Sequence, residues 1–418
     1  MAPAVNLVLR SKNAVIDKME ENKMDKIKVA DGIFYIGVDD EDIDLFESQY
    51  VVPDGVSYNS YVIMDEKTVI MDTVDKRKTK EWLERLQVVL GERIPDYLVV
   101  SHLEPDHASS IQVLVEKYPT MQLVGNVKTF QMFSNFFDMD VEEKKVVVKE
   151  GDTLSLGKHE LVFYMAPMVH WPEVMVSYEK KEKILFSADG FGKFGALKIK
   201  ESPYEAPLED WACEARRYYF NIVGKYGVAV QTLLKKVSGL DIQMIAPLHG
   251  PVLKENLAYY IDKYNTWSSY EPEDKGILIA YASIHGNTKE VAQKLAEYIG
   301  KEEKVVLTDL SREDMAETIE DAFRYDRMVV AAPTYDGGLF PVMEDFLRHL
   351  KAKAYQKRTV AVIENGSWAP MAGKIMCGIL QEMKDIEMIE PVITVKSTLN
   401  KESNEAIERL ATVLKNGK

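Results

Sequence analysis

Cysteine is scarce in this chain of 418 residues: there are only two, Cys213 and Cys377, and they lie far apart. That pattern excludes a disulfide framework, a Cys-x-x-Cys pair and a cysteine-ligated iron–sulfur or rubredoxin centre within the chain. Long apolar runs are missing too, since the longest, such as residues 277–281 and 328–333, fall far short of the ~20 residues that a membrane span needs. Residues 1–26 lack a proper signal-peptide core and a clear cleavage site. We therefore expect a cytoplasmic protein that is not inserted in a membrane.

Positive charge is also in deficit. The 52 lysines and arginines face 67 aspartates and glutamates, which gives a net charge of −15, and no basic block occurs. Nucleic acids and anionic membranes are bound mainly through clustered Lys and Arg side chains, so neither is an expected partner. The length suggests two or three domains of ~150 residues, each large enough to bury its own core.

The first part of the chain, from about residue 27 to 270, contains short strand-like runs separated by turn clusters. Such runs with amphipathic stretches between them predict sheets packed under helices. The predicted strands are residues 27–38, 58–65, 67–74, 97–102, 122–126, 161–167 and 183–190, and the predicted helices are residues 78–90 and 209–237. Residues 266–276, polar and with a proline and a glycine, predict an inter-domain linker. We expect one domain over residues 1–270, including an N-terminal extension at 1–26, and another over residues 271–418.

The second part alternates regularly between strand-like and helical stretches. Its strand-like runs are residues 276–281, 304–310, 327–333, 358–365 and 388–396, and a helical stretch follows each of them. Five such β-α units predict a doubly wound, five-stranded parallel sheet with helices on both faces. In sheets of this kind ligands bind beyond the carboxyl ends of the strands, so the loops at those ends form the candidate site.

Two of the seven histidines fall in the dense sequence His102-x-Glu104-x-Asp106-His107. This cluster begins where the predicted strand 97–102 ends. Alternate residues of an extended segment point the same way. His102 and Glu104 can therefore meet one metal ion, while the following turn carries Asp106 and His107 toward a second.

Three more candidate ligands stand just past apolar runs and beside glycine or proline: His170, Asp189 and His249. His159 and His349 lie next to charged residues without such partners, and we predict that they are not ligands. Four imidazoles and three carboxylates without a thiolate form a hard donor set, which suits iron or manganese better than zinc. A carboxylate such as Asp189 is able to bridge two irons.

In the second part, the loop after the first strand precedes a predicted helix. This loop consists of Ser283, Ile284, His285, Gly286, Asn287 and Thr288. Its small and hydroxyl residues offer backbone N–H groups, hydroxyls and the positive end of the helix dipole to a phosphate. The loop is neither a nucleotide-hydrolase P-loop nor a G-x-G-x-x-G fingerprint. Taken alone, it is equally compatible with a simple helix cap by Asn287.

Two further loops, residues 331–341 and 364–373, follow the third and fourth strands. Tyr335 or Trp368 can stack on a flat ring there, and glycine backbone can approach such a ring closely. A packing role is the alternative for Trp368. The expected contacts are Pro333, Thr334, Tyr335, Asp336, Gly337, Gly338, Asn365, Gly366, Ser367 and Trp368.

The metal-ligand spacing resembles the metallo-β-lactamase superfamily, whose usual zinc pattern is H-x-H-x-D-H. Glu104 replaces the middle histidine, as in the diiron domain of flavodiiron proteins, and the sequences around His170, Asp189 and His249 are similar to that family too. The resemblance implies an αββα sandwich that holds two irons with Asp189 between them. It implies that one iron is held by His102, Glu104 and His170 and the other by Asp106, His107 and His249. Glu173 departs from the family's usual H-W-P-D phrase, which has aspartate there.

The second part resembles the flavodoxin fold with bound FMN. The residues most similar to that family's phosphate loop are Ser283, His285, Gly286, Asn287 and Thr288. His285 replaces the more usual aromatic or small residue and is able to pair directly with the phosphate.

The resemblance as a whole is to a minimal two-domain flavodiiron protein, which implies reduction of dioxygen to water or of nitric oxide to nitrous oxide. Electron counting agrees, because a flavin and a diferrous pair store two electrons each and together match the full reduction of dioxygen. The resemblance also implies a separate electron donor of the rubredoxin or flavin-reductase type. The family's head-to-tail homodimer, alone or within a tetramer, would bring the FMN of one subunit to the irons of the other.

Two alternatives stay open at this point. One is a zinc-dependent hydrolase of the metallo-β-lactamase fold, fused to a flavodoxin-like electron carrier, in which metal-bound hydroxide attacks the substrate. Glu104 and the attached flavodoxin-like part count against it. The other is a non-enzymatic electron carrier whose first part is a structural remnant, and the intact set of seven candidate ligands counts against that one.

Overall fold

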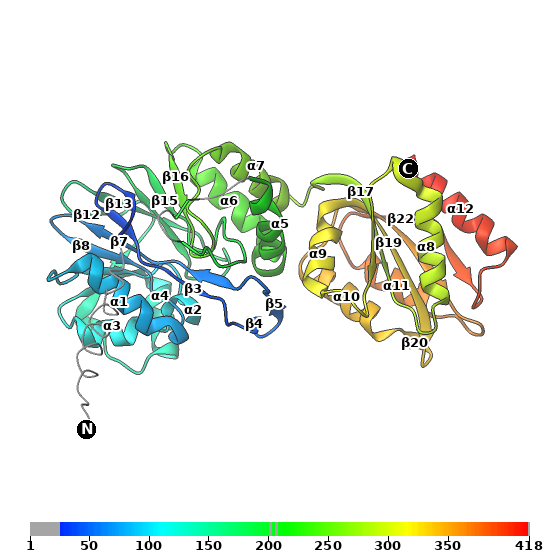
Figure 1. Ribbon diagram of the computed structural model, residues 1–418, viewed down its shortest axis with the longest axis horizontal. Coiled ribbons are helices and arrows are strands. Elements are labelled where there is room, and N and C mark those ends of the chain that lie inside the picture. Colours follow the sequence, from blue (N-terminus) through cyan, green and yellow to red (C-terminus); the bar gives the residue numbers. More distant parts are fainter. Residues whose placement is uncertain (1–25, 200–202, 205–207, 417–418) are drawn as a thin grey trace, which may run out of the picture.

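The computed structural model describes residues 26–199, 203–204 and 208–416. The predicted N-terminal extension lies outside the described residues except for its last position. Two α/β halves lie side by side along the long axis of the molecule (Figure 1). Within the described ranges, no helix is long and apolar enough to cross a membrane.

The first half contains two stacked sheets. The larger has the order β1-β2-β7-β8-β9-β10-β11, with bounds Ile27–Ala30, Ile33–Tyr35, Tyr61–Met64, Thr68–Met71, Tyr97–Val99, Gln122–Asn126 and Lys145–Val148. The smaller has the order β12-β13-β14-β15-β16, with bounds Thr153–Ser155, Glu160–Met165, Met175–Glu179, Ile184–Phe186 and Met244–Ala246. Buried side chains such as Ile63, Val99, Phe163 and Phe186 form one apolar core between the sheets.

Helices cover the outer faces of both sheets (Figure 1). The larger sheet is covered by α1 (Thr79–Leu90), α3 (Ile111–Lys117) and α4 (Val127–Phe136), and the smaller by α5 (Leu208–Tyr218), α6 (Gly227–Val237) and α7 (Leu257–Ser268). These helices pack on the sheets through an apolar face. In α1, for example, Trp82, Leu86 and Val89 recur at helical spacing and are all buried. The predicted αββα sandwich is confirmed.

The predicted helical stretch over residues 209–237 is confirmed, but it is not one uniform α-helix. Between α5 and α6 the chain forms a π-helical turn, η3 (Tyr219–Val223), and a 3-10 turn, η4 (Gly224–Tyr226). Close packing accompanies this irregularity, because a Cβ atom on Gly227 would lie 2.4 Å from the Ser268 carbonyl oxygen. Only glycine fits there, and this contact lies too far along the chain for helical periodicity to reveal it.

The second half is a parallel sheet in the order β18-β17-β19-β21-β22, with bounds Val305–Asp309, Asp274–Tyr281, Tyr325–Tyr335, Arg358–Asn365 and Ile386–Val395. One face carries α8 (Asn287–Ile299) and α12 (Lys401–Lys415), and the other carries α9 (Met315–Arg324), α10 (Pro341–Ala352) and α11 (Ala372–Gln381) (Figure 1). The predicted doubly wound sheet is confirmed. A short sixth strand, β20 (Gly338–Leu339), pairs antiparallel with β19 and was not predicted.

The predicted linker at 266–276 overlaps both neighbouring elements, because α7 continues to Ser268 and β17 begins at Asp274, so residues 269–273 make the connection. This polar segment is held in place by Glu273, whose side chain is only 5% exposed and accepts hydrogen bonds from Arg216 (2.6 Å), Lys263 (2.6 Å) and the Trp267 indole (2.6 Å). The predicted domain boundary between residues 270 and 271 falls in this segment and stays a prediction.

The two halves share a buried interface. Arg216 of α5 also pairs with Glu320 of α9, and both side chains are almost completely buried. Next to this pair, Phe220 stacks on Phe323 with ring centroids 4.3 Å apart, and the Asn221 side-chain amide donates to the Ala316 carbonyl (3.1 Å). Buried ion pairs and stacked rings of this kind hold the two halves in one orientation.

Arg216→Ala tests this interface. The substitution leaves the Glu273 and Glu320 carboxyls buried without the guanidinium that they share, so we expect the free energy of unfolding to fall by about 3–5 kcal/mol in urea titrations. Arg348→Ala is the matched control, because within the described part of the chain exposed Arg348 pairs with Glu344 of its own helix alone, so its replacement should cost less than about 1 kcal/mol. Equal urea midpoints for the two variants would show that the Arg216 ion pairs do not stabilise the protein more than a surface pair does.

Candidate metal centre and flavin pocket

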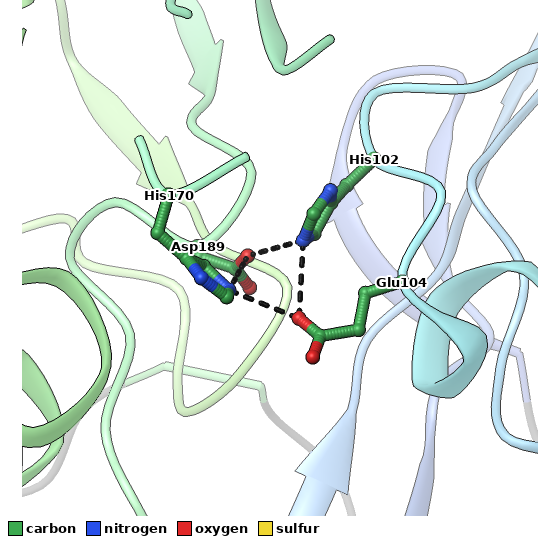
Figure 2. A group of neighbouring side chains, drawn as sticks. All are labelled: His102, Glu104, His170 and Asp189. Atoms are coloured by element: carbon green, nitrogen blue, oxygen red, sulfur yellow. Dashed lines mark hydrogen bonds and ion pairs between the residues drawn. The ribbon is translucent and has the colours of Figure 1, made fainter. Parts of the chain in front are cut away.

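Four predicted ligands converge at the carboxyl ends of strands in the first half (Figure 2). His102 follows β9, Glu104 precedes the short helix α2 (Pro105–Ala108), His170 follows β13 and Asp189 follows β15. Glu104 Oε2 lies 3.1 Å from His102 Nε2 and 2.9 Å from His170 Nε2. Asp189 Oδ2 lies 3.2 Å and 3.4 Å from the same two nitrogens. We call His102, Glu104 and His170 the first ligand group, to which Asp189 adds its Oδ2.

The second ligand group consists of Asp106, His107 and His249. Asp106 and His107 belong to α2, and His249 follows β16. Asp106 Oδ2 lies 3.3 Å from His107 Nε2 and 3.2 Å from His249 Nε2. The two imidazole nitrogens are only 3.0 Å apart, so they aim at one point.

Asp189 lies between the two groups and turns one carboxylate oxygen to each. Its Oδ2 faces the first group, while its Oδ1 lies 3.4 Å from His107 Nε2 and 3.7 Å from His249 Nε2. The residue is 1% exposed, so the carboxylate is removed from water. This is the arrangement that a carboxylate bridge between two metal ions requires.

The donor atoms fit two metal ions. Ligands about 2.1 Å from one ion and roughly perpendicular to each other lie about 3 Å apart, which is close to the separations within each group. No described residue donates a hydrogen bond to either carboxylate oxygen of Asp106 or Asp189, although these oxygens are buried. Buried carboxylates without donors are costly unless a cation compensates them. The predicted ligands are therefore brought together in a geometry that suits a pair of cations.

The proton equilibria of the site point the same way. Burial works to lower the pKa of His170, but Asp189 and Glu104 outweigh it and raise that pKa to about 9. Burial likewise opposes the shift at Asp189, yet the surrounding imidazoles, His102 foremost, bring its pKa well below the ordinary value. The carboxylates thus attract positive charge into the site, and metal ions supply it without protons.

Groups behind the ligands orient two of the histidines. The His102 Nδ1–H donates to Glu173 Oε1 (2.8 Å), and the His249 Nδ1–H donates to the Ser57 carbonyl (2.7 Å), which leaves Nε2 of both rings free for a metal. Glu173 also accepts from the Leu103 backbone N–H (2.9 Å) and is completely buried. The departure from aspartate at this position therefore keeps a carboxylate behind the ligand histidine.

The two histidines predicted not to be ligands lie in neither group. His159 is buried and pairs through Nδ1 with Glu179 (2.9 Å). His349 is on the surface, where its ring bonds the Asp345 carbonyl one turn earlier in α10.

A cavity of about 530 Å³ opens at the carboxyl edge of the second sheet. The predicted residues that line it are Ser283, Ile284, His285, Asn287, Thr288, Pro333, Thr334, Tyr335, Asp336, Gly337, Asn365, Gly366, Ser367 and Trp368. Gly286 and Gly338 do not line it. Gly286 instead precedes α8 with φ +94°, and its N–H donates to the Ser283 hydroxyl (3.1 Å). The sequence interpretation missed two lining residues, Ala369 and Ser397.

Hydrogen bonds between the loops hold this cavity open. The Thr334 hydroxyl accepts from the Met371 backbone N–H (2.9 Å), and the Asn365 side chain makes two bonds with the backbone of Ser397 (2.9 and 3.0 Å). Tyr335 is 44% exposed and Trp368 83% exposed. Both rings are therefore accessible at the cavity, where a flat ligand ring can stack on them.

Comparison with known proteins agrees with both halves. The ODP family beta lactamase model matches residues 56–250, and a flavodoxin domain model matches residues 278–388. An uncharacterized protein of Methanocaldococcus jannaschii is 31% identical over 331 residues, which cover 78% of this chain and 81% of that protein. The solved structure of the flavodiiron protein from Giardia intestinalis has the same fold, with a TM-score of 0.88 at 23% identity, and the match covers 94% of this chain and 96% of that one. The chain belongs to the flavodiiron protein family.

Other members of the flavodiiron family are similar over almost the whole chain. Rubredoxin-oxygen oxidoreductase of Megalodesulfovibrio gigas is 29% identical over 402 residues, which cover 94% of this chain and 98% of that protein. Its solved structure gives a TM-score of 0.88 at 27% identity and covers 94% of this chain and 98% of that one. Nitric oxide reductase of Moorella thermoacetica is 29% identical over 376 residues, which cover 88% and 93% of the two chains. A flavodoxin domain implies a flavin, so this flavodiiron chain combines a flavin site with a metal-binding cluster.

The sequence interpretation also missed the cavity beside the metal ligands. This opening of about 280 Å³ is lined by Glu104 and Asp106 together with side chains from residues 43–48, and by Tyr58, Asp75 and Arg77. Residues 45–51 form the short hairpin β4 (Leu45–Phe46) and β5 (Tyr50–Val51). Strands of two residues are too short to show a periodicity, which explains why no pattern predicted this hairpin.

Asp189→Ala tests the shared carboxylate. Because the variant removes one donor from each ligand group, we expect iron affinity to fall by about 100-fold or more while flavin binding is unchanged. Metal analysis after titration with ferrous iron measures the first quantity, and visible absorption measures the second. Asp241→Ala, on the surface near Lys183, is the control and should bind metal as the unchanged protein does. Full retention of iron by the Asp189 variant would refute the bridging assignment.

Thr288→Phe tests the loop before α8. The Thr288 side chain is 3% exposed at the edge of the cavity, so a benzyl group must either enter the cavity or displace the loop. We expect FMN affinity to fall about tenfold or more in titrations of the flavin-free protein, with metal content unchanged. Thr412→Phe on the exposed side of α12 is the control. Equal FMN affinity in the two variants would remove Thr288 from the flavin site.

Proposed function

We propose that this flavodiiron chain reduces dioxygen to water or nitric oxide to nitrous oxide at two irons, with electrons relayed through FMN. The observation that carries the proposal is Asp189, whose two oxygens face two separate histidine–carboxylate groups in a chain that also has a flavin pocket. Relatives named rubredoxin-oxygen oxidoreductase and nitric oxide reductase support both gases as substrates.

Iron is the metal that the donor set favours. His102, Glu104 and His170 would hold one iron, and Asp106, His107 and His249 the other, with Asp189 shared between them. All seven donors are imidazoles or carboxylates, which are harder than the thiolates of many zinc sites. Two irons bound there would supply redox chemistry and the positions at which the gas is reduced.

The protein's own residues shape the reaction site. Glu173 and the Ser57 carbonyl hold His102 and His249 with Nε2 toward the metals, which fixes the ligand geometry before the metals arrive. The ligand side chains that keep the most contact with solvent are Glu104, Asp106 and His170, at 16%, 12% and 8% exposure. Substrate and electrons therefore have their shortest approach on that side of the cluster.

FMN is the flavin that we propose for the second half. The Ser283 and Thr288 hydroxyls and the backbone N–H groups at the start of α8 would bind its phosphate, and His285 would add a hydrogen bond or a positive charge. Tyr335 and Trp368 would flank the isoalloxazine ring. We propose residues 1–270 as the diiron domain and 271–418 as the FMN domain.

The fixed orientation of the two halves supports a head-to-tail homodimer as the working unit. The flavin pocket and the ligand groups lie at the sheet edges of different halves, and the buried Arg216 cluster opposes any hinge between them. Exposed apolar side chains stand near both openings: Leu45 at the metal side, and Ile284 and Trp368 at the flavin pocket. Two copies in opposite orientation would cover the exposed apolar side chains at both openings. A separate protein of the rubredoxin or flavin-reductase type would supply the electrons.

Metal and flavin content, followed by gas consumption on the same anaerobically reduced sample, tests the proposal. We expect about two irons and one FMN per chain and rapid consumption of dioxygen or nitric oxide, whose separate rates give the preferred gas. Two zinc ions, no gas consumption and hydrolase activity would favour the alternative of a zinc hydrolase fused to an electron carrier. Bound FMN without metal would favour an electron carrier.

A further inference from the structure

The β4–β5 hairpin forms one wall of the cavity beside the ligand groups. Leu45, Phe46, Glu47 and Ser48 line this opening together with Glu104 and other residues. On its inner side, the Phe46 ring meets the His249 ring edge-on, with centroids 5.4 Å apart and planes at 88°. The position of the hairpin therefore sets the space above the second ligand group.

The hairpin is too small to define its own position. Its two strands contain two residues each, and at its tip Glu47 and Ser48 both have positive φ, +48° and +57°. Side chains other than glycine adopt this conformation only at a cost, so contacts outside the hairpin must hold it.

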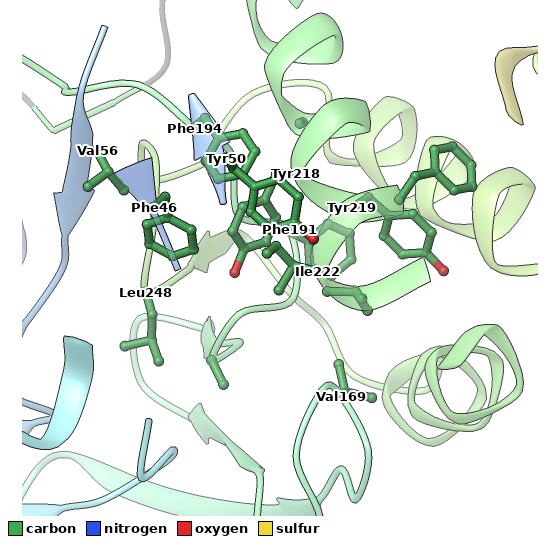
Figure 3. Close-up of a cluster of buried hydrophobic side chains, with 14 of the residues drawn as sticks. Phe46, Tyr50, Val56, Val169, Phe191, Phe194, Tyr218, Tyr219, Ile222 and Leu248 are labelled. Carbon is green, nitrogen blue, oxygen red and sulfur yellow. The ribbon is translucent and has the colours of Figure 1, made fainter. Parts of the chain in front are cut away.

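Those contacts converge on Tyr50. Its ring packs beside Phe194 near Tyr218 (Figure 3), and its hydroxyl donates to the Asn221 carbonyl in η3 (3.0 Å). Lys353, which directly follows α10 in the second half, donates to the same carbonyl (2.6 Å) and to the Tyr50 hydroxyl (3.3 Å). Its ammonium also lies 5.8 Å from the centre of the Tyr50 ring, within reach of a cation–π interaction.

Arg217 forms a second contact between the hairpin and the second half. The Arg217 guanidinium donates to the carbonyl of Val51, the last residue of the hairpin, and pairs with Asp314 at the start of α9 (2.9 Å). It also lies over the Phe194 ring at 5.0 Å. Both contacts thus connect the cavity wall of the first half to helices of the second half.

We propose that Lys353 is a positioning residue of the FMN domain that holds the β4–β5 hairpin over the metal pair and so fixes the substrate cavity. The inference rests on the proposed function only for the identity of the substrate. The contact of Lys353 with Tyr50 and Asn221 is independent of that function. Lys353 touches neither metal ligands nor flavin pocket, and it acts through Tyr50 and Asn221. Burial lowers the pKa of Lys353 to about 8, so experiments at pH 6.5 keep the ammonium charged.

The hairpin position is measured first, by a readout that needs neither gas nor activity. Endoproteinase Glu-C cleaves after glutamate, and Glu47 stands exposed at the hairpin tip. In the metal- and flavin-loaded protein, Lys353→Met should raise the rate of cleavage after Glu47 about tenfold, as mass spectrometry detects it. Tyr50→Phe should do the same, and Lys353→Arg should restore protection. Lys351→Met is the matched control, because exposed Lys351 pairs, among the residues that the structure describes, with Glu382 alone.

Gas kinetics then test the effect on the cavity. With reductant in excess, Lys353→Met and Tyr50→Phe should raise the KM for the gas more than they change kcat, while Lys351→Met has the parameters of the unchanged protein. Unchanged cleavage in both variants would overturn the proposal, and so would faster cleavage with an unchanged KM. If the unchanged protein consumes neither gas, the proposed function fails, whereas the cleavage rates still decide whether Lys353 holds the hairpin.

Discussion

The concentration of buried carboxylates among four imidazoles is the constraint on which the metal-binding cluster of the first half depends. Asp189 and Asp106 are held inside the protein with no hydrogen-bond donor from any described residue, and four imidazoles converge on their oxygens. A protein tolerates such a concentration of negative charge only where positive charge balances it. The loops that carry these residues follow four different strands, so the sandwich acts as a scaffold that brings distant segments to one point.

The second constraint is the rigid connection between the halves. Arg216, Glu273 and Glu320 form a buried cluster, and Phe220 stacks on Phe323 beside it. Because the halves keep one orientation, the homodimer that we propose would bring the FMN of one copy to the metal ligands of the other. At the same interface, Lys353 contacts Tyr50 and Arg217 contacts Val51 of the β4–β5 hairpin. Contacts that fix the orientation of the domains therefore also shape the cavity beside the metals.

Local patterns made much of this predictable from the sequence. His102, Glu104, Asp106 and His107 lie within one short segment, and the loop that we propose for the phosphate precedes the amphipathic helix α8. The features that escaped prediction depend on contacts between distant segments. Tyr50 meets Asn221, and Gly227 lies against Ser268, so neither the hairpin nor the break between α5 and α6 leaves a periodic signal. The contacts of Glu273 with Arg216 and Trp267 escaped prediction for the same reason, because composition does not show them.

The most direct test of the account is anomalous X-ray diffraction from crystals of the aerobically purified protein, measured on both sides of the iron absorption edge. We predict two iron peaks about 3.5–4 Å apart, one on each side of Asp189, with one carboxylate oxygen directed to each. The first peak should lie among His102, Glu104 and His170 and the second among Asp106, His107 and His249. A single peak, or peaks whose anomalous signal does not rise across the iron edge, would contradict a diiron centre bridged by Asp189.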